Sequence, residues 1–318
     1  MMRIDGSRIA LIGGTGFIGS TLAPLLVDRG ASVLAVGRCP SPGLSYDTKS
    51  LDVGSDDAFG RWIEDYDGFV YLASYSDPVS RWRVGPDNGA ALRVNVDGFR
   101  KLLAAVARSH RPTTVVLASS IAAAMPPFGG YALHKRAAEK LLEEAASLGA
   151  VRGAVVRLPT VYGAGTARPV MGSGVVATFV RQAWSGRAIT LWGDGTVRRS
   201  LLHVDDAARA LIAALEHADS LGPRPFAVGP RSVTSLVDIA SSVVAAVNRQ
   251  GGRACDPQHV PMPEHAAPSD LQDALVDASA FERLAGWTPH TTLRDGLEDL
   301  VHVLDPRSRP PVIGPFTG

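Results

Sequence analysis

Two side chains suited to proton transfer stand four positions apart near the middle of the chain. They are Tyr131 and Lys135, in the segment Tyr131-Ala132-Leu133-His134-Lys135, and residues at i and i+4 share one face of a helix. A free tyrosine has a pKa of about 10, too high for proton exchange at neutral pH. We expect the nearby ammonium to lower the pKa of the phenol. The pair predicts acid–base chemistry on a carbonyl or an alcohol, and only four lysines in the chain make the match more telling.

Two more polar side chains precede this pair. Ser120 ends an apolar run 11 residues before Tyr131, and a hydroxyl there can hold a substrate oxygen against the phenol. Turn formation at the strand end is the alternative. Asn95 could fix the backbone or a water near Lys135, or serve only helix packing. Ser120, Tyr131, Lys135 and Asn95 are therefore the candidate catalytic residues.

A glycine-rich turn follows the first apolar run of the chain. The segment Gly13-Gly14-Thr15-Gly16-Phe17-Ile18-Gly19 has the spacing of a dinucleotide-binding turn. Gly13 permits the tight turn, Gly16 lets a pyrophosphate approach the backbone, and Gly19 allows close packing of helix on strand. The helix that follows offers free N–H groups and a partial positive charge to phosphates.

The end of the second strand selects between the two nicotinamide dinucleotides. NAD sites usually place an acidic residue there for the adenosine ribose, but this chain has Gly37 followed by Arg38. A guanidinium can pair with a 2′-phosphate and stack on adenine, so NADP(H) is favoured and NAD(H) remains possible; a surface arginine is the alternative. Asp52 is placed to reach the adenine amino group, or to cap a turn. The candidate cofactor contacts are Gly13, Thr15, Gly16, Phe17, Ile18, Gly19, Arg38, Asp52, Val53, Leu72, Ala73, Lys135 and Pro159.

Short β-branched runs alternate with helix-period segments in the first half of the chain. The runs 9–12, 32–36, 69–72, 113–118 and 151–158 predict buried strands, and segments 18–28, 91–108 and 131–148 predict helices. Helices are also expected at 200–217, 278–285 and 293–304. This alternation predicts an α/β protein with a Rossmann-type, doubly wound parallel sheet and a smaller C-terminal α/β lobe.

The pattern also suggests a division of the chain. We expect a dinucleotide-binding domain over 1–160, with 198–222 returning to it. A substrate-binding lobe would comprise 161–197 and 223–304, and a proline-rich tail, 305–318, would be extended or disordered.

Composition excludes several classes of protein. The 318 residues are 46% apolar and 20% charged, with a net charge of +1, which argues against bulk disorder and against a nucleic-acid partner. No apolar run approaches the roughly 18 residues of a membrane span. Cys39 and Cys255 alone make neither a disulfide scaffold nor a metal site. We expect a cytoplasmic protein without a metal or membrane partner.

The glycine turn, Ser120 and the Tyr131/Lys135 pair together resemble the extended short-chain dehydrogenase/reductase family, which includes nucleotide-sugar epimerases, dehydratases and ketoreductases. Further segments are similar to motifs of this family: Asn95-Val96-Asp97-Gly98, Arg157-Leu158-Pro159-Thr160-Val161-Tyr162-Gly163 (with Thr160 in place of asparagine), Gly193-Asp194-Gly195-Thr196-Val197-Arg198-Arg199 and Ala285-Gly286-Trp287-Thr288-Pro289. The resemblance implies a nucleotide-sugar substrate contacted by Ser120, Thr160, Tyr162 and Arg199, with Arg199 on the diphosphate. It also implies a homodimer packed through 91–108 and 131–148.

One departure discriminates within the family. The dehydratases carry an adjacent Asp–Glu pair after the catalytic Ser/Thr, whereas Ile121-Ala122-Ala123-Ala124 follows Ser120. This disfavours a dehydratase, and Gly37-Arg38 favours a reductase that uses NADPH over an epimerase that keeps NAD. The sequence therefore predicts an NADPH-dependent ketoreductase, acting on a keto group, at C4, of a nucleotide-linked deoxysugar, with Tyr131 as proton donor. The alternatives are an NAD-dependent nucleotide-sugar C4-epimerase, a reductase of a non-sugar ketone, and a non-catalytic NAD(P) sensor.

Overall fold

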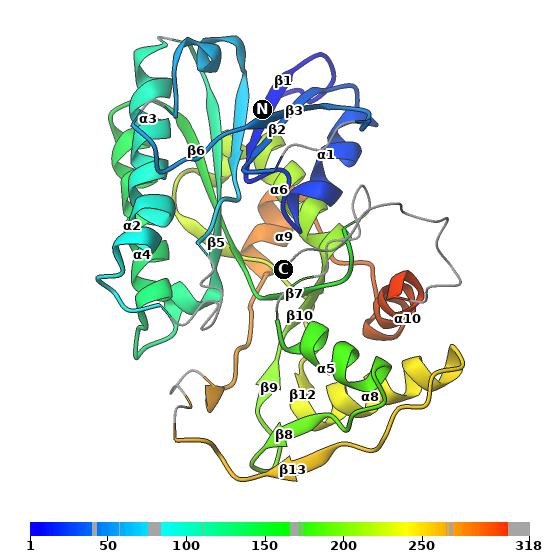
Figure 1. Ribbon diagram of the computed structural model, residues 1–318. Helices are drawn as coiled ribbons and strands as arrows, with labels where there is room; N and C mark the ends of the chain where they lie inside the picture. The colour runs from blue at the N-terminus through cyan, green and yellow to red at the C-terminus, as the bar shows by residue number, and fades with distance from the viewer. Residues whose placement is uncertain are drawn as a thin grey trace.

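A seven-stranded parallel sheet forms the centre of the protein in the computed structural model (Figure 1), which describes residues 1–304 except 40–42, 57, 76–83, 110, 166–171, 173, 265 and 267–269. The strands are β1 (Arg8–Ile12), β2 (Ser32–Gly37), β3 (Asp47–Ser50), β4 (Gly68–Tyr71), β5 (Thr114–Ser120), β6 (Arg152–Leu158) and β11 (Pro225–Ala227). Their order in space is β11-β6-β5-β4-β1-β2-β3. The order reverses at β1, which creates a switch point beyond the carboxyl ends of β1 and β4. The predicted Rossmann-type fold is confirmed.

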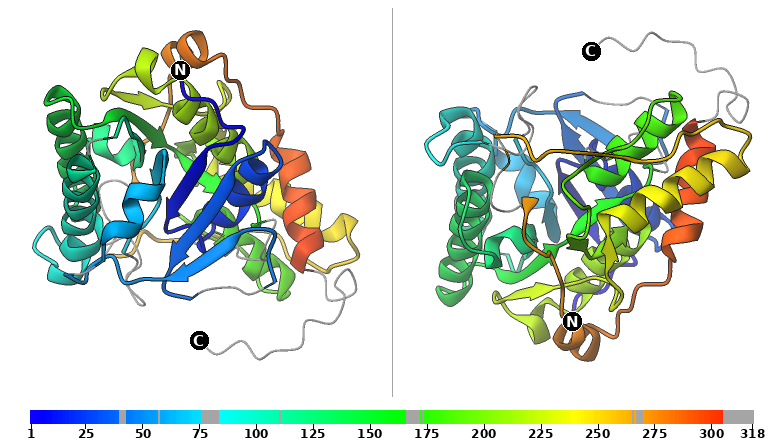
Figure 2. Two further views of the ribbon diagram at one scale, coloured as in Figure 1. Left: turned by 90° about the horizontal axis from the view of Figure 1, so that it is seen from above. Right: turned by 90° about the horizontal axis from the view of Figure 1, so that it is seen from below.

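Alternate residues of β1 belong to two separate cores. Ile9 and Leu11 pack in a cluster with α1 (Gly19–Val27) and α6 (Val204–Glu216), whereas Ala10 and Ile12 pack in another with α3 (Gly98–Arg108) and α4 (Gly130–Ser147). A sheet covered on both faces needs apolar residues at every position of its central strands, which explains the uninterrupted apolar runs. Figures 1 and 2 show α3 and α4 together on one side of the sheet.

The helix expected over 91–108 is interrupted. It consists of α2 (Gly89–Leu92), a π-helical turn η2 (Arg93–Asp97) and α3. The turn brings the Val94 carbonyl oxygen within 2.6 Å of the Tyr71 hydroxyl, which donates to it. Such bulges are common at functional sites, and Asn95 lies in this one.

The second lobe has its own core beneath the sheet in the view of Figure 1, between α5, α8 and α10. The remaining elements are η1 (Arg61–Asp65), η3 (Ile121–Ala124), β7 (Thr160–Tyr162), α5 (Val175–Trp184), β8 (Thr190–Trp192), β9 (Arg198–Arg199), β10 (Leu201–His203), α7 (Ala218–Leu221), β12 (Thr234–Ser235), α8 (Leu236–Arg249), β13 (Gln258–Val260), α9 (Ser279–Ala285) and α10 (Leu293–Leu304). Within the described ranges, no helix combines the length and the apolar character needed to cross a membrane.

The C-terminal half differs from expectation: helices α5 and α8 were not predicted, and two predicted segments have other boundaries. The segment 200–217 begins as β10, which pairs with β7, and becomes helical only at α6. The sheet also gains β11 from residues 225–227, just beyond the segment 198–222 that was expected to return to the first domain. The division into domains otherwise stays a prediction, and the tail 305–318 lies outside the described residues.

Candidate active site

A cavity of about 270 Å³ opens at the switch point, beyond the carboxyl ends of the central strands. It is lined by Gly13, Gly16, Phe17, Ile18, Gly19, Leu72, Ser74, Ala118, Ser119, Ser120, Tyr131, Lys135, Leu158, Pro159, Val161, Gly172 and Gly174. The glycine turn and the candidate proton-transfer residues, more than 100 positions apart in the chain, therefore share one cavity.

The glycine turn approaches two other backbone segments closely. Gly13 has φ +90°, and a Cβ there would lie 2.6 Å from the Ala73 nitrogen, in the loop after β4. A Cβ on Gly19 would collide with the backbone of Gly14. Among the described residues, no acceptor receives the backbone N–H groups of Phe17 and Ile18. Free donors at a helix start, beside glycines that leave room, suit a pyrophosphate, so the turn fits a dinucleotide.

A segment of the second lobe closes over this turn. A Cβ on Gly172 would lie 2.9 Å from the Phe17 ring, and Gly174 and Val161 also line the cavity. These contacts were not expected from the sequence. The sequence does contain one signal for such contacts, because residues 163–174 are rich in glycine. Glycine allows the chain to approach a neighbouring segment closely.

The end of β2 has no room for a side chain at position 37. A Cβ on Gly37 would collide with the Thr15 side chain, and Arg38 beside it is exposed. A carboxylate of the kind used by NAD sites cannot stand at position 37 unless Thr15 moves. Position 37, where NAD sites of this fold usually carry an acidic residue, therefore has no carboxylate, and the next residue is the exposed Arg38.

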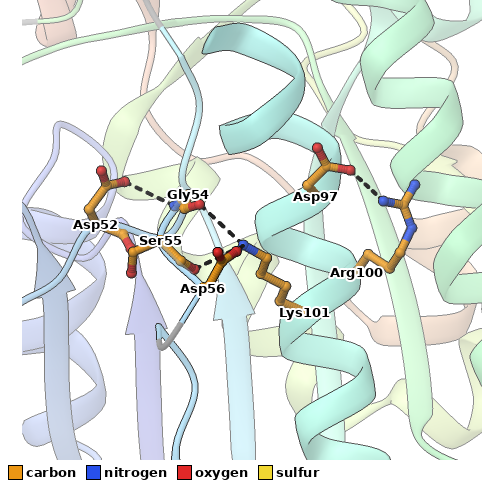
Figure 3. Close-up of polar contacts among 7 residues, drawn as sticks. All are labelled: Asp52, Gly54, Ser55, Asp56, Asp97, Arg100 and Lys101. Carbon is orange, nitrogen blue, oxygen red and sulfur yellow. Dashed lines mark hydrogen bonds and ion pairs between the residues drawn. The ribbon is translucent and has the colours of Figure 1, made fainter. Parts of the chain in front are cut away.

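Lys101 fastens the loop that carries Asp52 and Val53. Its Nζ donates to the carbonyl oxygens of Gly54 (3.2 Å) and Ser55 (2.9 Å) and to Asp56 Oδ1 (2.9 Å), as Figure 3 shows. Asp52 Oδ1 in turn accepts from the Gly54 N–H at 2.9 Å. The Asp52 side chain is therefore held in a turn, in a loop whose shape depends on a lysine from α3.

Replacing Lys101 with methionine is expected to raise the KM for the dinucleotide about three- to tenfold, equivalent to ~1 kcal/mol, and to leave kcat nearly unchanged. The loop predicted to contact adenine loses its anchor, while Ser120, Tyr131 and Lys135 keep their contacts. Steady-state kinetics with the intact dinucleotide and with reduced nicotinamide mononucleotide, which lacks adenosine, would measure this.

Arg100→Met is the matched control. It removes a positive charge one position away, but Arg100 pairs with Asp97 next to its own helix (Figure 3), so the dinucleotide KM should not change. An equal rise of the dinucleotide KM in both variants would mean that the effect comes only from the loss of a positive charge. A rise with the mononucleotide as well would contradict a role confined to the adenine end.

Ser120, Tyr131 and Lys135 converge at the other end of the cavity. The Ser120 hydroxyl accepts from the Ala122 N–H at 3.2 Å and is hydrogen-bonded to the Tyr131 phenol. Lys135 Nζ donates to the Ala118 carbonyl oxygen at 2.8 Å and lies 5.7 Å from the centroid of the Tyr131 ring. The hydroxyl, the phenol and the ammonium are thus positioned by the end of β5 and the first two turns of α4.

The expectation that Lys135 lowers the pKa of the phenol is wrong for this structure. Burial raises the pKa of Tyr131 to about 12, against a smaller opposite effect of the Ser120 hydrogen bond. Burial also lowers the pKa of Lys135 to about 8, and the Glu139 carboxylate opposes that shift. The ammonium points toward a main-chain oxygen of β5, so its charge is too weakly felt at the phenol to outweigh the desolvation that raises the pKa of Tyr131. Tyr131 is therefore protonated at neutral pH and set to donate.

Asn95 lies behind the cavity and does not line it. It is buried, its Oδ1 accepts from the Tyr75 N–H at 2.7 Å, and its Nδ2 is 3.4 Å from His134 Nδ1. His134 Nε2 is 2.8 Å from the Pro86 carbonyl oxygen. Asn95 thus holds the loop after β4, and a direct catalytic contact stays a prediction.

Three predicted substrate contacts are also not among the cavity-lining residues. Thr160 begins β7. Tyr162 is buried in the core of the second lobe, where its hydroxyl donates to the Thr292 carbonyl oxygen at 3.2 Å. The Arg199 guanidinium donates to the carbonyl oxygens of Gln272 (2.6 Å) and Asp270 (3.2 Å). The structure therefore brings Ser120, but not these three, to the cavity, and their contact with substrate stays a prediction.

A sequence profile of the NAD dependent epimerase/dehydratase family matches residues 9–229. The dTDP-4-dehydro-6-deoxy-D-allose reductase of Streptomyces bikiniensis is 28% identical over 324 residues, covering 93% of this chain and 96% of its own. The dTDP-6-deoxy-L-talose 4-dehydrogenase (NAD(P)(+)) of Kitasatospora kifunensis is 27% identical over 315 residues, covering 92% and 94%. Among solved structures, that of MoeE5 in complex with UDP-glucose and NAD is similar, with 26% identity, a TM-score of 0.77 and coverage of 94% and 98%.

Proposed function

Because this chain belongs to the NAD dependent epimerase/dehydratase family, we propose that it is the NADPH-dependent reductase of a keto group, at C4, of a nucleotide-linked deoxysugar. The observation that carries the proposal is a protonated Tyr131 in the same molecule as a β2 end where position 37 has no room for a carboxylate. A protonated phenol is ready to donate, as a reduction requires.

The preference for NADPH rests on the end of β2. Thr15 fills the space where an acidic side chain would stand at position 37, and Arg38 is exposed beside it. A guanidinium pairs with a phosphate through two parallel hydrogen bonds. The glycine turn holds the pyrophosphate with the N–H groups of Phe17 and Ile18.

The chain's own residues then handle one proton. Bound nicotinamide supplies hydride to the carbonyl carbon. The Ser120 hydroxyl orients the carbonyl oxygen, and the Tyr131 phenol protonates it. The Lys135 ammonium stabilises the phenolate that remains, through the field it exerts across the ring.

Elimination of water has no support in the residues after Ser120. They form η3 (Ile121–Ala124), a stretch without any acid or base. A substrate whose C4 ketone already exists therefore fits the site better than one that must be dehydrated. The two curated relatives, named as a 4-dehydro-6-deoxysugar reductase and a 6-deoxysugar 4-dehydrogenase, support a substrate of this class.

The test is turnover of a dTDP-linked 4-keto-6-deoxysugar with NADPH. Oxidation of NADPH is monitored as the loss of absorbance at 340 nm, in the presence and absence of substrate. We expect turnover with NADPH, and a lower kcat/KM with NADH. Equal or better kinetics with NADH would contradict the role given to Arg38. Absence of turnover with any nucleotide-linked ketosugar would contradict the proposal.

The C4-epimerase is the second candidate, because the family includes epimerases and because MoeE5 was solved with UDP-glucose and NAD. An epimerase keeps its cofactor through the cycle, so NAD would co-purify and turnover would need no added cofactor. The homodimer through α3 and α4 stays a prediction that gel filtration can test.

A further inference from the structure

Three successive turns of α4 are joined to three consecutive residues at the end of β5. Tyr131 is hydrogen-bonded to Ser120, and Lys135 Nζ donates to the Ala118 carbonyl oxygen at 2.8 Å. One turn further on, Glu139 Oε1 accepts from the Ser119 hydroxyl at 2.5 Å. The first two contacts belong to the proposed mechanism, and the third has no part in it.

Glu139 is a buried carboxylate, 7% exposed, with a partner on the next strand. Arg157, in β6, donates from Nε to Oε1 at 2.8 Å and from Nη2 to Oε2 at 2.6 Å. The Arg157 side chain is 20% exposed, so the pair is largely but not fully buried. Replacing a buried ion pair with apolar side chains often costs no stability, so stability alone gives little reason for charges here. Their position, beside Ser119 and one helical turn from Lys135, suggests an electrostatic role.

We propose that Glu139 is a positioning residue that keeps the ammonium of Lys135 charged, and that Arg157 limits how strongly the carboxylate does so. The inference rests on the proposed catalytic role of Lys135. Glu139 acts through Lys135 and touches neither substrate nor cofactor.

Few other groups around Lys135 can keep its ammonium charged. Lys135 is 6% exposed, and burial lowers its pKa while the Glu139 charge raises it. On its own helix the neighbouring titratable groups are Tyr131 and His134, and the guanidinium of Arg136 donates to the Ala123 carbonyl oxygen at 3.1 Å. Strand β5 and η3 contain no charged side chain. Other charged residues on the described elements packed against α4 are at least partly exposed: Arg93, Asp97, Arg100, Lys101, Arg108 and Arg152. Glu139 is buried one helical turn from Lys135, and Arg157, whose side chain is 20% exposed, holds both of its carboxylate oxygens. This geometry makes the two charges the candidates for setting the ionisation state of Lys135.

Two single variants separate this role from a structural one. Glu139→Gln and Arg157→Met both break the same ion pair, so both should lower thermal stability. They leave opposite charges behind, however. Without the carboxylate, Lys135 should lose its proton at lower pH; without the guanidinium, the carboxylate acts undiminished and Lys135 should keep its proton to higher pH. We expect each variant to shift the titration midpoint of Lys135 by about one pH unit, since the charges lie one helical turn away and on the adjoining strand.

The ionisation of Lys135 can be measured without turnover. The chain has only four lysines, Lys49, Lys101, Lys135 and Lys140, so ¹³C labelling of the lysine Cε yields four resolvable NMR signals, and Lys135→Met identifies the one in question. A failure of the proposed substrate would leave this titration intact, which keeps the two proposals separable. Activity with substrate then shows whether the high-pH limb of kcat follows the same order.

The expected order of the Lys135 titration midpoint is Arg157→Met highest, then the unaltered protein, then Glu139→Gln lowest. If a single variant does not fold, the double variant Glu139→Gln/Arg157→Met has no unpaired buried charge, and its midpoint should lie below that of the unaltered protein. Shifts in the same direction for both single variants, or an unchanged midpoint in Glu139→Gln or in the double variant, would overturn the proposal.

Discussion

Replacing Tyr131 with phenylalanine is expected to reduce turnover about 10²- to 10⁴-fold, the range lost when a positioned acid is removed. The substitution deletes one oxygen from a side chain that lines the cavity and whose phenol is protonated at neutral pH, because its pKa is about 12. The ring remains, so Lys135 keeps its place over it. Dinucleotide affinity, measured by fluorescence titration, should change little.

Tyr66→Phe supplies the matched control. The Tyr66 ring packs edge-on against Trp62 and at a tilt against Phe69, at the other end of the sheet, so loss of its hydroxyl should leave kcat unaltered. Turnover of Tyr131→Phe within threefold of the unaltered protein would rule out the phenol as the proton donor. Loss of dinucleotide binding in that variant would instead show that the ring itself had been displaced.

The rate of reduction is expected to be level at neutral pH and to fall tenfold per unit above pH 8. Two groups must keep their protons for this direction of the reaction. Tyr131, with a pKa of about 12, keeps its proton throughout this range, whereas Lys135, with a pKa of about 8, loses its proton first. Neutral Lys135 no longer stabilises the phenolate left after proton donation. Single-turnover rates at saturating substrate and dinucleotide, from pH 6 to 10, would measure this fall of the rate at high pH, the alkaline limb of the profile.

Lys135→Met is the companion variant. It should be slow at every pH and should lack the limb, since the group that titrates is gone. A rate that stays constant to pH 10 in the unaltered protein would mean that the charge of Lys135 is not needed. Dinucleotide affinity measured at each pH would distinguish a catalytic limb from one caused by weaker binding.

Five strands of the central sheet were predictable, because a parallel strand covered on both faces has to be apolar throughout. The runs around Ile9 and Val33 carry that signal. The edge strands β3, with the polar sequence DTKS, and β11, with three residues, were not predicted. The strands of the second lobe carry no such pattern, since β9 and β12 have two residues each. The amphipathic helix α8 (Leu236–Arg249) was also not predicted, although its buried residues Ile239, Val243 and Val247 recur at helical spacing.

The candidate site was predictable where one short segment contains both a functional residue and the helix or turn that positions it. The turn at Gly13 and the helix face at Tyr131 and Lys135 are of this kind. The contact of Gly172 with Phe17, and the direction of the Arg199 side chain, depend on how distant segments meet. The pKa of Tyr131 was predicted in the wrong direction because the sequence contains the charge of Lys135 but not the burial that outweighs it.

The position of α6 and β11 bears on how the protein forms during synthesis. Ala207 and Leu211 of α6 cover the face of the sheet that Ile9 and Leu11 present, and β11 pairs along the outer edge of β6. A nascent chain that ends at residue 160 would therefore expose an apolar sheet face and an unpaired strand edge, both of which promote aggregation. The dinucleotide-binding half is continuous in space but not along the chain. It becomes complete only after more than 220 residues have left the ribosome.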